Sequence, residues 1–271
     1  MIILRDKTYL EQKEFGIISR VGRKIARGRI KMAKKLEKDI SNDLKIIKDS
    51  ELERKRTRLL RGKNLEENLS KEANSHGVLV TNARLSDDSS SALIKNLKKK
   101  ELEEYKNLNS DNPSALESAR QLFGNKKKKA DVISYPANAS VQDLAHEIGH
   151  LNTKNIKGVK NRLSNFITHK TDARGEIAKT VSSEVTKENM SRNPGKSALN
   201  YIRGKALVRE EINANREGRK LLKKHGLPEK YFEDVDKSYN AAENSYKAAS
   251  RIAWKSPIKN FIKPKHHGRK N

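Results

Sequence analysis

The chain has 271 residues, of which 35% are charged and 34% hydrophobic, and its formal net charge is +26. It contains no cysteine, which excludes disulfides, thiolate metal ligands and a cysteine nucleophile. A chain this polar cannot bury all of itself in one core, and it has no apolar run of about 18 residues that would predict a transmembrane helix. We therefore expect a compact core with charged helical arms around it.

A strongly basic helix is predicted for residues 16–63. Apolar residues recur there mostly every four positions, with one longer gap at Gly28, and basic residues recur beside them at spacings of three and four. Residues 20–38 hold nine Lys or Arg and one acid, Glu37. Such a face is typical of a solvated surface helix, of a contact with nucleic acid or another polyanion, or of docking onto a partner protein.

Two short strands are predicted in the middle of the chain. Val78–Thr81 and residues 131–135 are β-branched or apolar runs bounded by turn-forming residues. The densely charged residues 92–108 have the pattern of a helix, as do residues 114–123. Two strands do not make a sheet, so a third is expected from the start of the chain or from residues 156–168.

The second half of the chain has a helical pattern over residues 174–250. Asn193-Pro194-Gly195 interrupts it, and a helix over 197–224 ends at Gly226. Residues 255–271 contain six Lys or Arg and no acid, which predicts a flexible basic tail.

The motif that carries chemistry is His146-Glu147-Ile148-Gly149-His150, which has the form H-E-x-x-H. Ser140 and Asp143 provide a capping-box start for the helix that contains it. Because they are four residues apart on that helix, His146 and His150 share one face, where both imidazoles reach a single zinc ion. Glu147 then lies where a carboxylate can act as general base on a zinc-bound water.

A catalytic zinc takes three protein ligands and keeps one position open, so a third ligand has to come from elsewhere in the chain. Glu210 and Glu211 on the 197–224 helix are the candidates. The face that Glu211 shares is apolar or small and consists of Leu207, Ala214, Gly218 and Leu221. A carboxylate buried on that face needs a partner, which a zinc ion would supply, and this favours Glu211. Glu210, on a more polar side, remains the alternative.

With these motifs the chain resembles the gluzincins, zinc peptidases in which the two histidines of H-E-x-x-H and a downstream glutamate hold the metal. In several gluzincins the third ligand lies in a segment of the form E-x-x-A-[DN], which Glu211-Ile212-Asn213-Ala214-Asn215 fits. The resemblance implies that Asn215, an aspartate in the family, orients His146. It covers residues 131–151 and 207–221. The lysine-rich arms also look similar to proteins of prophages and mobile elements.

Together these observations predict a mostly helical α+β fold, with a small sheet packed on the H-E-x-x-H helix and long basic helical arms. The expected domains are a basic arm over residues 1–70, a zinc metallopeptidase-like domain over 71–226, and a helical extension with a basic tail over 227–271. The predicted function is that of a zinc metalloendopeptidase that hydrolyses a polypeptide substrate. Val78–Thr81 is expected to be the sheet edge that pairs with this substrate. An oxyanion donor is also expected, with four candidates: Tyr201, Arg203, His169 and His225.

Two alternatives remain open. One is a phage-particle or mobile-element structural protein that keeps a metallopeptidase fold and docks through its basic arms onto phage structural proteins or nucleic acid. The other is a nucleic-acid-binding protein in which the H-E-x-x-H segment is incidental. The start of the chain, Met1 to Lys7, is charged too early for a signal-peptide core, which predicts a cytoplasmic protein or one associated with virions.

Overall fold

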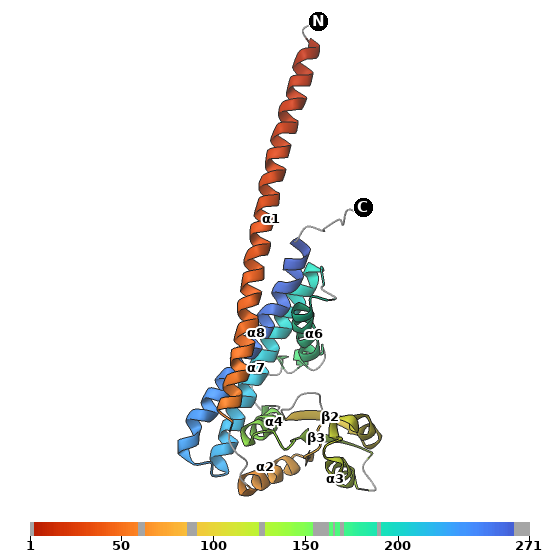
Figure 1. The fold of residues 1–271 in the computed structure, drawn as a ribbon, viewed down its shortest axis with the longest axis vertical. Helices are drawn as coiled ribbons and strands as arrows, with labels where there is room; N and C mark the ends of the chain where they lie inside the picture. Colours follow the sequence, from red (N-terminus) through yellow and green to blue (C-terminus); the bar gives the residue numbers. More distant parts are fainter. Residues whose placement is uncertain are drawn as a thin grey trace.

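The computed structural model of the protein describes residues 3–58, 63–85, 91–124, 128–153, 163–164, 166–168, 171–188 and 191–262, with side chains from residue 24 onward. The fold is mostly helical with a small three-stranded sheet, which confirms the predicted α+β class (Figure 1). None of the described helices combines the length and the apolar character needed to cross a membrane.

The sheet has the strand order β1-β3-β2. β1 (Val78–Thr81) runs parallel to β3 (Lys129–Ser134), and β2 (Ala92–Lys98) runs antiparallel to it. The strands predicted at residues 78–81 and 131–135 are therefore confirmed, and they pair with each other directly.

Both faces of the sheet are covered. Ile133 of β3 belongs to the core cluster that contains Leu144, on the helix with the histidine motif. Its neighbour Val132 belongs to a second cluster, together with Leu116 of α3 (Pro113–Phe123). Because successive residues of a strand point to opposite faces, a continuous apolar run suits a strand that is buried on both sides.

The third strand, β2, lies where a helix was predicted. Residues 92–98 pair with β3, and Lys99–Tyr105 continue as a 3-10 helix, so the α-helix predicted over residues 92–108 was wrong. The pairing register shifts between Ile94 and Leu97, where Asn96 has a φ of 55°. Pairing with a distant strand thus outweighs the local helical pattern, as tertiary context often does.

Neither expected source supplies this third strand. The start of the chain is helical, within α1 (Ile3–Arg56). In the segment 156–168, the described residues are helical and the remainder lies outside the described residues.

Helix α4 (Val141–Thr153) carries the histidine motif and begins where the sequence predicts. The Ser140 backbone N–H donates to Asp143 Oδ2 at 3.0 Å, and the Asp143 backbone N–H donates to Ser140 Oγ at 3.2 Å. This reciprocal capping box satisfies donors that the first turn of a helix leaves free. Leu144 and Ile148 are fully buried, so the sheet packs on this helix as predicted.

Helix α7 (Pro194–Lys224) crosses α4 at very short range. A Cβ added to Gly149 would lie 2.3 Å from the backbone oxygen of Ala214 and 3.0 Å from the backbone nitrogen of Gly218. Only a glycine fits at such a crossing, because any side chain would force the helices apart. The small residues predicted beside Glu211 thus allow the close approach that brings it to the two histidines.

Helix α8 (Phe232–Ile262) packs against both α1 and α7, and the N-terminal part of α1 extends beyond this bundle (Figure 1). An ion pair links α1 to α8, with Arg251 Nη2 2.7 Å from Asp43 Oδ1. The predicted basic helix is therefore present, but it begins earlier than residue 16 and ends sooner than residue 63.

The C-terminal end of α8 corrects another prediction. Residues 255–262 are helical, so a flexible tail was wrong for them, and residues 263–271 lie outside the described residues. Lys259 is buried there, and its Nζ lies 2.5 Å from Glu184 Oε2 of α6 (Ala173–Thr186). A buried lysine requires such a partner, so a distant carboxylate helps to hold this segment in the helix. The domain boundaries at residues 70 and 226 stay predictions.

Candidate metal centre

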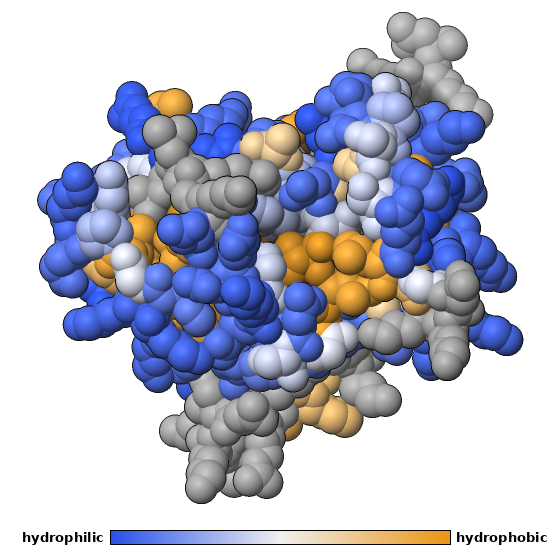
Figure 2. All heavy atoms as spheres, turned by 90° about the horizontal axis from the view of Figure 1, so that it is seen from below, coloured by the Kyte–Doolittle hydropathy of each residue, from blue (hydrophilic) through white to orange (hydrophobic). Residues whose placement is uncertain are grey.

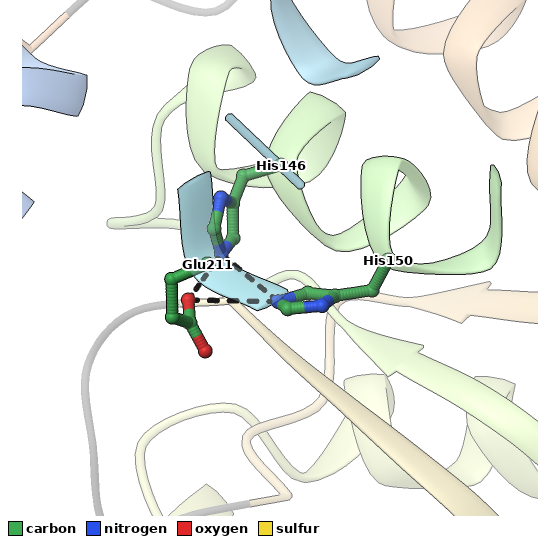
Figure 3. A group of neighbouring side chains, drawn as sticks. All are labelled: His146, His150 and Glu211. Carbon is green, nitrogen blue, oxygen red and sulfur yellow. Dashed lines mark hydrogen bonds and ion pairs between the residues drawn. The ribbon is translucent and has the colours of Figure 1, made fainter. Parts of the chain in front are cut away.

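Three side chains from two helices converge on one point: His146 and His150 from α4, and Glu211 from α7 (Figure 3). His146 Nε2 lies 3.1 Å from His150 Nε2 and 3.2 Å from Glu211 Oε2, and the remaining pair is 3.6 Å apart. A tetrahedral zinc ion with ligands at about 2.0–2.1 Å holds its ligand atoms about 3.3 Å from one another. The three atoms are therefore spaced as such an ion requires.

The buried state of Glu211 gives an independent test of whether a metal fits. Its side chain is 0% exposed, and within the part of the chain that the structure describes its Oε2 accepts no hydrogen bond. Its other oxygen, Oε1, contacts the guanidinium of Arg174. A buried acceptor that receives no hydrogen bond costs about 1–3 kcal/mol. A metal ion between Glu211 Oε2 and the histidines would remove that cost, so the donor set fits a metal.

The outer ring nitrogen of each histidine has its own partner. His146 Nδ1 lies 2.7 Å from Asn215 Oδ1, and His150 Nδ1 lies 3.5 Å from Glu210 Oε1. The Asn215 amide nitrogen donates to the backbone oxygen of Tyr239 at 3.4 Å, which directs its Oδ1 toward the imidazole. Both histidines are thereby set to carry a proton on Nδ1 and to present the Nε2 lone pair to the site, as metal ligands do.

Glu210 and Glu211 contact different ring nitrogens of the histidines. Glu211 lies on the Nε2 side of both histidines, whereas Glu210 meets His150 from the outer side. The structure thus brings the three predicted ligands together, and Asn215 contacts the outer nitrogen of His146. Glu210 takes a position behind His150 that corresponds to the position of Asn215 behind His146.

The charges of the site are strongly coupled. Burial opposes protonation of His150, but the carboxylates of Glu211 and Glu210 outweigh it and raise the pKa of His150 to about 9. Burial also disfavours the charged form of Glu211, which by itself would raise its pKa. The positive charges of Arg174 and His150 outweigh burial and hold the pKa of Glu211 well below its usual range. At neutral pH the metal-free site therefore holds an ionised Glu211 beside a His150 that carries a proton on Nε2 as well as on Nδ1, and a metal ion has to displace the Nε2 proton to bind there.

Glu147 lies between the two histidines in sequence and faces β2. Its Oε2 accepts a hydrogen bond from the Leu93 backbone N–H at 3.0 Å, which ties the carboxylate to the strand. A cavity of about 270 Å³ adjoins it, lined by Leu93, Lys95, Glu147, His150, Thr168, Asp172, Arg174 and Glu210. The Glu147 carboxylate thus lies at the wall of a cavity that His150 also lines.

Sequence reasoning missed Arg174 and the role of β2. Arg174 lies in the first turn of α6 with its side chain 52% exposed, and it both contacts Glu211 and lines the cavity. No motif marks it, because the contact spans 37 positions of the chain. Of the predicted oxyanion donors, His169 lies outside the described residues, and the others do not line the cavity: Tyr201, Arg203 and His225.

A second hollow lies at the opposite edge of the sheet. It has a volume of about 880 Å³ and lies between α2 (Lys63–Ser75), β1 and α3, with Val80, Leu122 and Tyr135 in its lining. Figure 2 shows an apolar patch within a hollow of an otherwise largely hydrophilic face. Its lining contains no histidine, whereas His150 of the group of three lines the smaller cavity.

Neither a protein-family model nor a curated protein nor a solved structure matches this chain. What the structure establishes is a buried group of two histidines and a glutamate that could hold a metal ion. The identity of the metal and the reaction have to be proposed from the chemistry of that group.

Proposed function

We propose that the protein is a zinc-dependent metallopeptidase. The observation that carries this proposal is the position of Glu147, which faces the same cavity as His150 while the three ligand atoms have the spacing of a zinc site. Two imidazoles and one carboxylate suit zinc, whereas calcium and magnesium prefer oxygen ligands alone. When bound, zinc supplies a Lewis acid that polarises a carbonyl and makes a water more acidic.

The residues of the chain divide the remaining work. Glu147 takes a proton from the attacking water and delivers it to the leaving nitrogen of the peptide bond. The Leu93 N–H holds that carboxylate at the cavity wall. Asn215 and Glu210 orient the two imidazoles, and Arg174 holds one oxygen of the third ligand so that the other faces the histidines.

The polypeptide substrate would lie along β2. This strand is at one edge of the sheet and contributes Leu93 and Lys95 to the cavity. An edge strand offers backbone groups with which an extended peptide can pair. The strand predicted for this role, β1, is the edge on the other side of β3 and borders the second hollow instead.

Substituting Glu147→Gln tests the proposal, because glutamine keeps an acceptor for the Leu93 N–H but cannot take a proton. We expect the variant to retain about one zinc per chain and to hydrolyse an unfolded protein such as casein at least about 100-fold more slowly. Glu104→Gln, an exposed change of the same kind, is the matched control and should cleave like the parent.

Equal rates for Glu147→Gln and the parent would remove Glu147 from the mechanism. A parent protein that binds zinc but cleaves no unfolded polypeptide would refute the peptidase and favour the structural role predicted for a phage or mobile-element protein. That alternative, and docking onto phage proteins, stay predictions.

A further inference from the structure

The N-terminal part of α1 extends from the bundle, and no other described element covers it. The helix has 54 residues, which at 1.5 Å per residue gives a length of about 80 Å. Every residue from Lys24 to Met32 is exposed, and Ala33 is the first buried residue of its described side chains. Figure 1 shows this part of α1 standing clear of the other elements. It is a surface that contributes nothing to the core.

The exposed cations of α1 gather on one side of the helix. We define the basic stripe as Lys24, Arg27, Lys31, Lys34, Lys35 and Lys38. At 3.6 residues per turn, these six positions fall within about 100° of one another around the helix axis. All six side chains are exposed, and among the described residues none forms an ion pair with a carboxylate. Their charge is therefore directed at solvent, and Glu37 is the one acid between Lys24 and Lys38.

Two of the three acids in the same region, Asp39 and Asp43, meet cations of α8, whereas the third, Glu37, is exposed. Asp43 is buried against α8, where Arg251 and Lys255 meet its carboxylate at 2.7 and 3.3 Å. Asp39 lies 3.5 Å from the same lysine. The helix thus neutralises these negative charges inside the bundle and keeps its positive charges outside, which concentrates the field on one side.

The side opposite the stripe argues against a lipid surface as the partner. A helix that binds a bilayer buries a continuous apolar face in it. From Ala33 onward that side of α1 is covered by α8, as the burial of Ala33 and Ile40 shows. Before Ala33 it carries Ile25 and Met32 together with the charged Arg29, which is not a continuous apolar face. The stripe points away from that side, so it is the stripe that is available for contact.

We infer that the basic stripe of α1 binds the phosphate backbone of a nucleic-acid duplex. From Lys24 to Lys38 the stripe is about 21 Å long, at 1.5 Å per residue. Duplex DNA carries about one charge per 1.7 Å of its axis, and its major groove admits a helix. The stripe contains five Lys and one Arg, which suit contacts with phosphates, and it has no Asn or Gln to read adenine. The proposed contact is with the backbone, and it does not depend on the metal site.

Arg27 and Arg29 provide a matched pair of variants for the test. Both are exposed arginines on the free part of α1, but Arg29 falls on the side of the helix opposite the stripe. The affinity of the full chain for a mixed-sequence duplex of about 20 base pairs would be measured by fluorescence anisotropy between about 50 and 200 mM salt. Arg27→Gln should weaken binding several-fold and reduce the slope of log K against log salt by about 0.9, whereas Arg29→Gln should change both little.

A triple variant, Lys24→Gln with Arg27→Gln and Lys31→Gln, extends the series and should reduce the slope by about 2.7. Circular dichroism would show that each variant keeps the helical content of the parent. Equal effects of the two arginine substitutions would overturn the inference, because net charge alone would then explain the binding. The absence of duplex binding at about 50 mM salt, or tighter binding to vesicles of anionic lipid or to an acidic protein, would overturn it as well.

Discussion

Replacing Glu211 by glutamine removes the charge of the third ligand while almost preserving its size. The side chain is fully buried, and one of its oxygens faces both Nε2 atoms at 3.2 and 3.6 Å. Two opposite unit charges about 4 Å apart attract by about 4 kcal/mol at an effective dielectric constant of 20, and a zinc ion carries two charges. Part of this is offset, because Arg174 and His150 already balance the carboxylate in the metal-free site.

We therefore expect Glu211→Gln to weaken zinc binding by at least about 2.7 kcal/mol, which is about 100-fold. Glu210→Gln is the control. Loss of an outer partner of a ligating histidine typically costs about 10- to 100-fold, and the 3.5 Å contact of Glu210 with His150 is long, so about 10-fold is expected. Competition with a chromogenic chelator would measure both affinities. A larger loss for Glu210→Gln would refute the ligand assignment, and unchanged affinity in both variants would refute the site.

Two further predictions concern stability in the presence of a chelator, measured by urea unfolding. Gly149→Ala should destabilise the fold by at least about 1–3 kcal/mol because its methyl group meets the Ala214 backbone oxygen. A Cβ added at Gly28 meets no atom within 4 Å, so Gly28→Ala should stabilise the fold by about 0.5–1 kcal/mol. Similar effects of Gly149→Ala and Gly28→Ala on the free energy of unfolding would contradict the close crossing of α4 and α7. The folded pKa of His150, about 9, lies above its ordinary value of 6.5, so the folded state binds more protons between these values. Its contribution to stability is complete below about pH 6.5 and is lost as the pH rises to about 9, and His150→Gln should abolish this loss.

The parts of the fold that the sequence predicts well are those specified by local signals. The start of α4 follows from Ser140 and Asp143, which cap each other three residues apart. The choice of Glu211 follows from the small and apolar residues on its own helix face. The two ligating histidines are fixed by their spacing in the motif.

The parts that were missed depend on contacts between distant residues. β2 exists because residues 92–98 pair with β3, and their charged, helix-like composition does not show this. The basic composition around Lys259 is that of a solvated tail, but its ion pair with Glu184, 75 positions away, holds it in a helix. Arg174 reaches Glu211 across 37 positions. In each case a partner that no local pattern specifies decides the outcome.

The metal content of the purified, untagged chain tests the central claim most directly. After dialysis against zinc and then against metal-free buffer, elemental analysis should find about one zinc per chain in the parent and in Glu147→Gln. The double variant His146→Ala with His150→Ala should retain almost none, because two of the three ligands are lost. A parent that retains no zinc, or a double variant that retains as much as the parent, would contradict the assignment of His146, His150 and Glu211 as the zinc site.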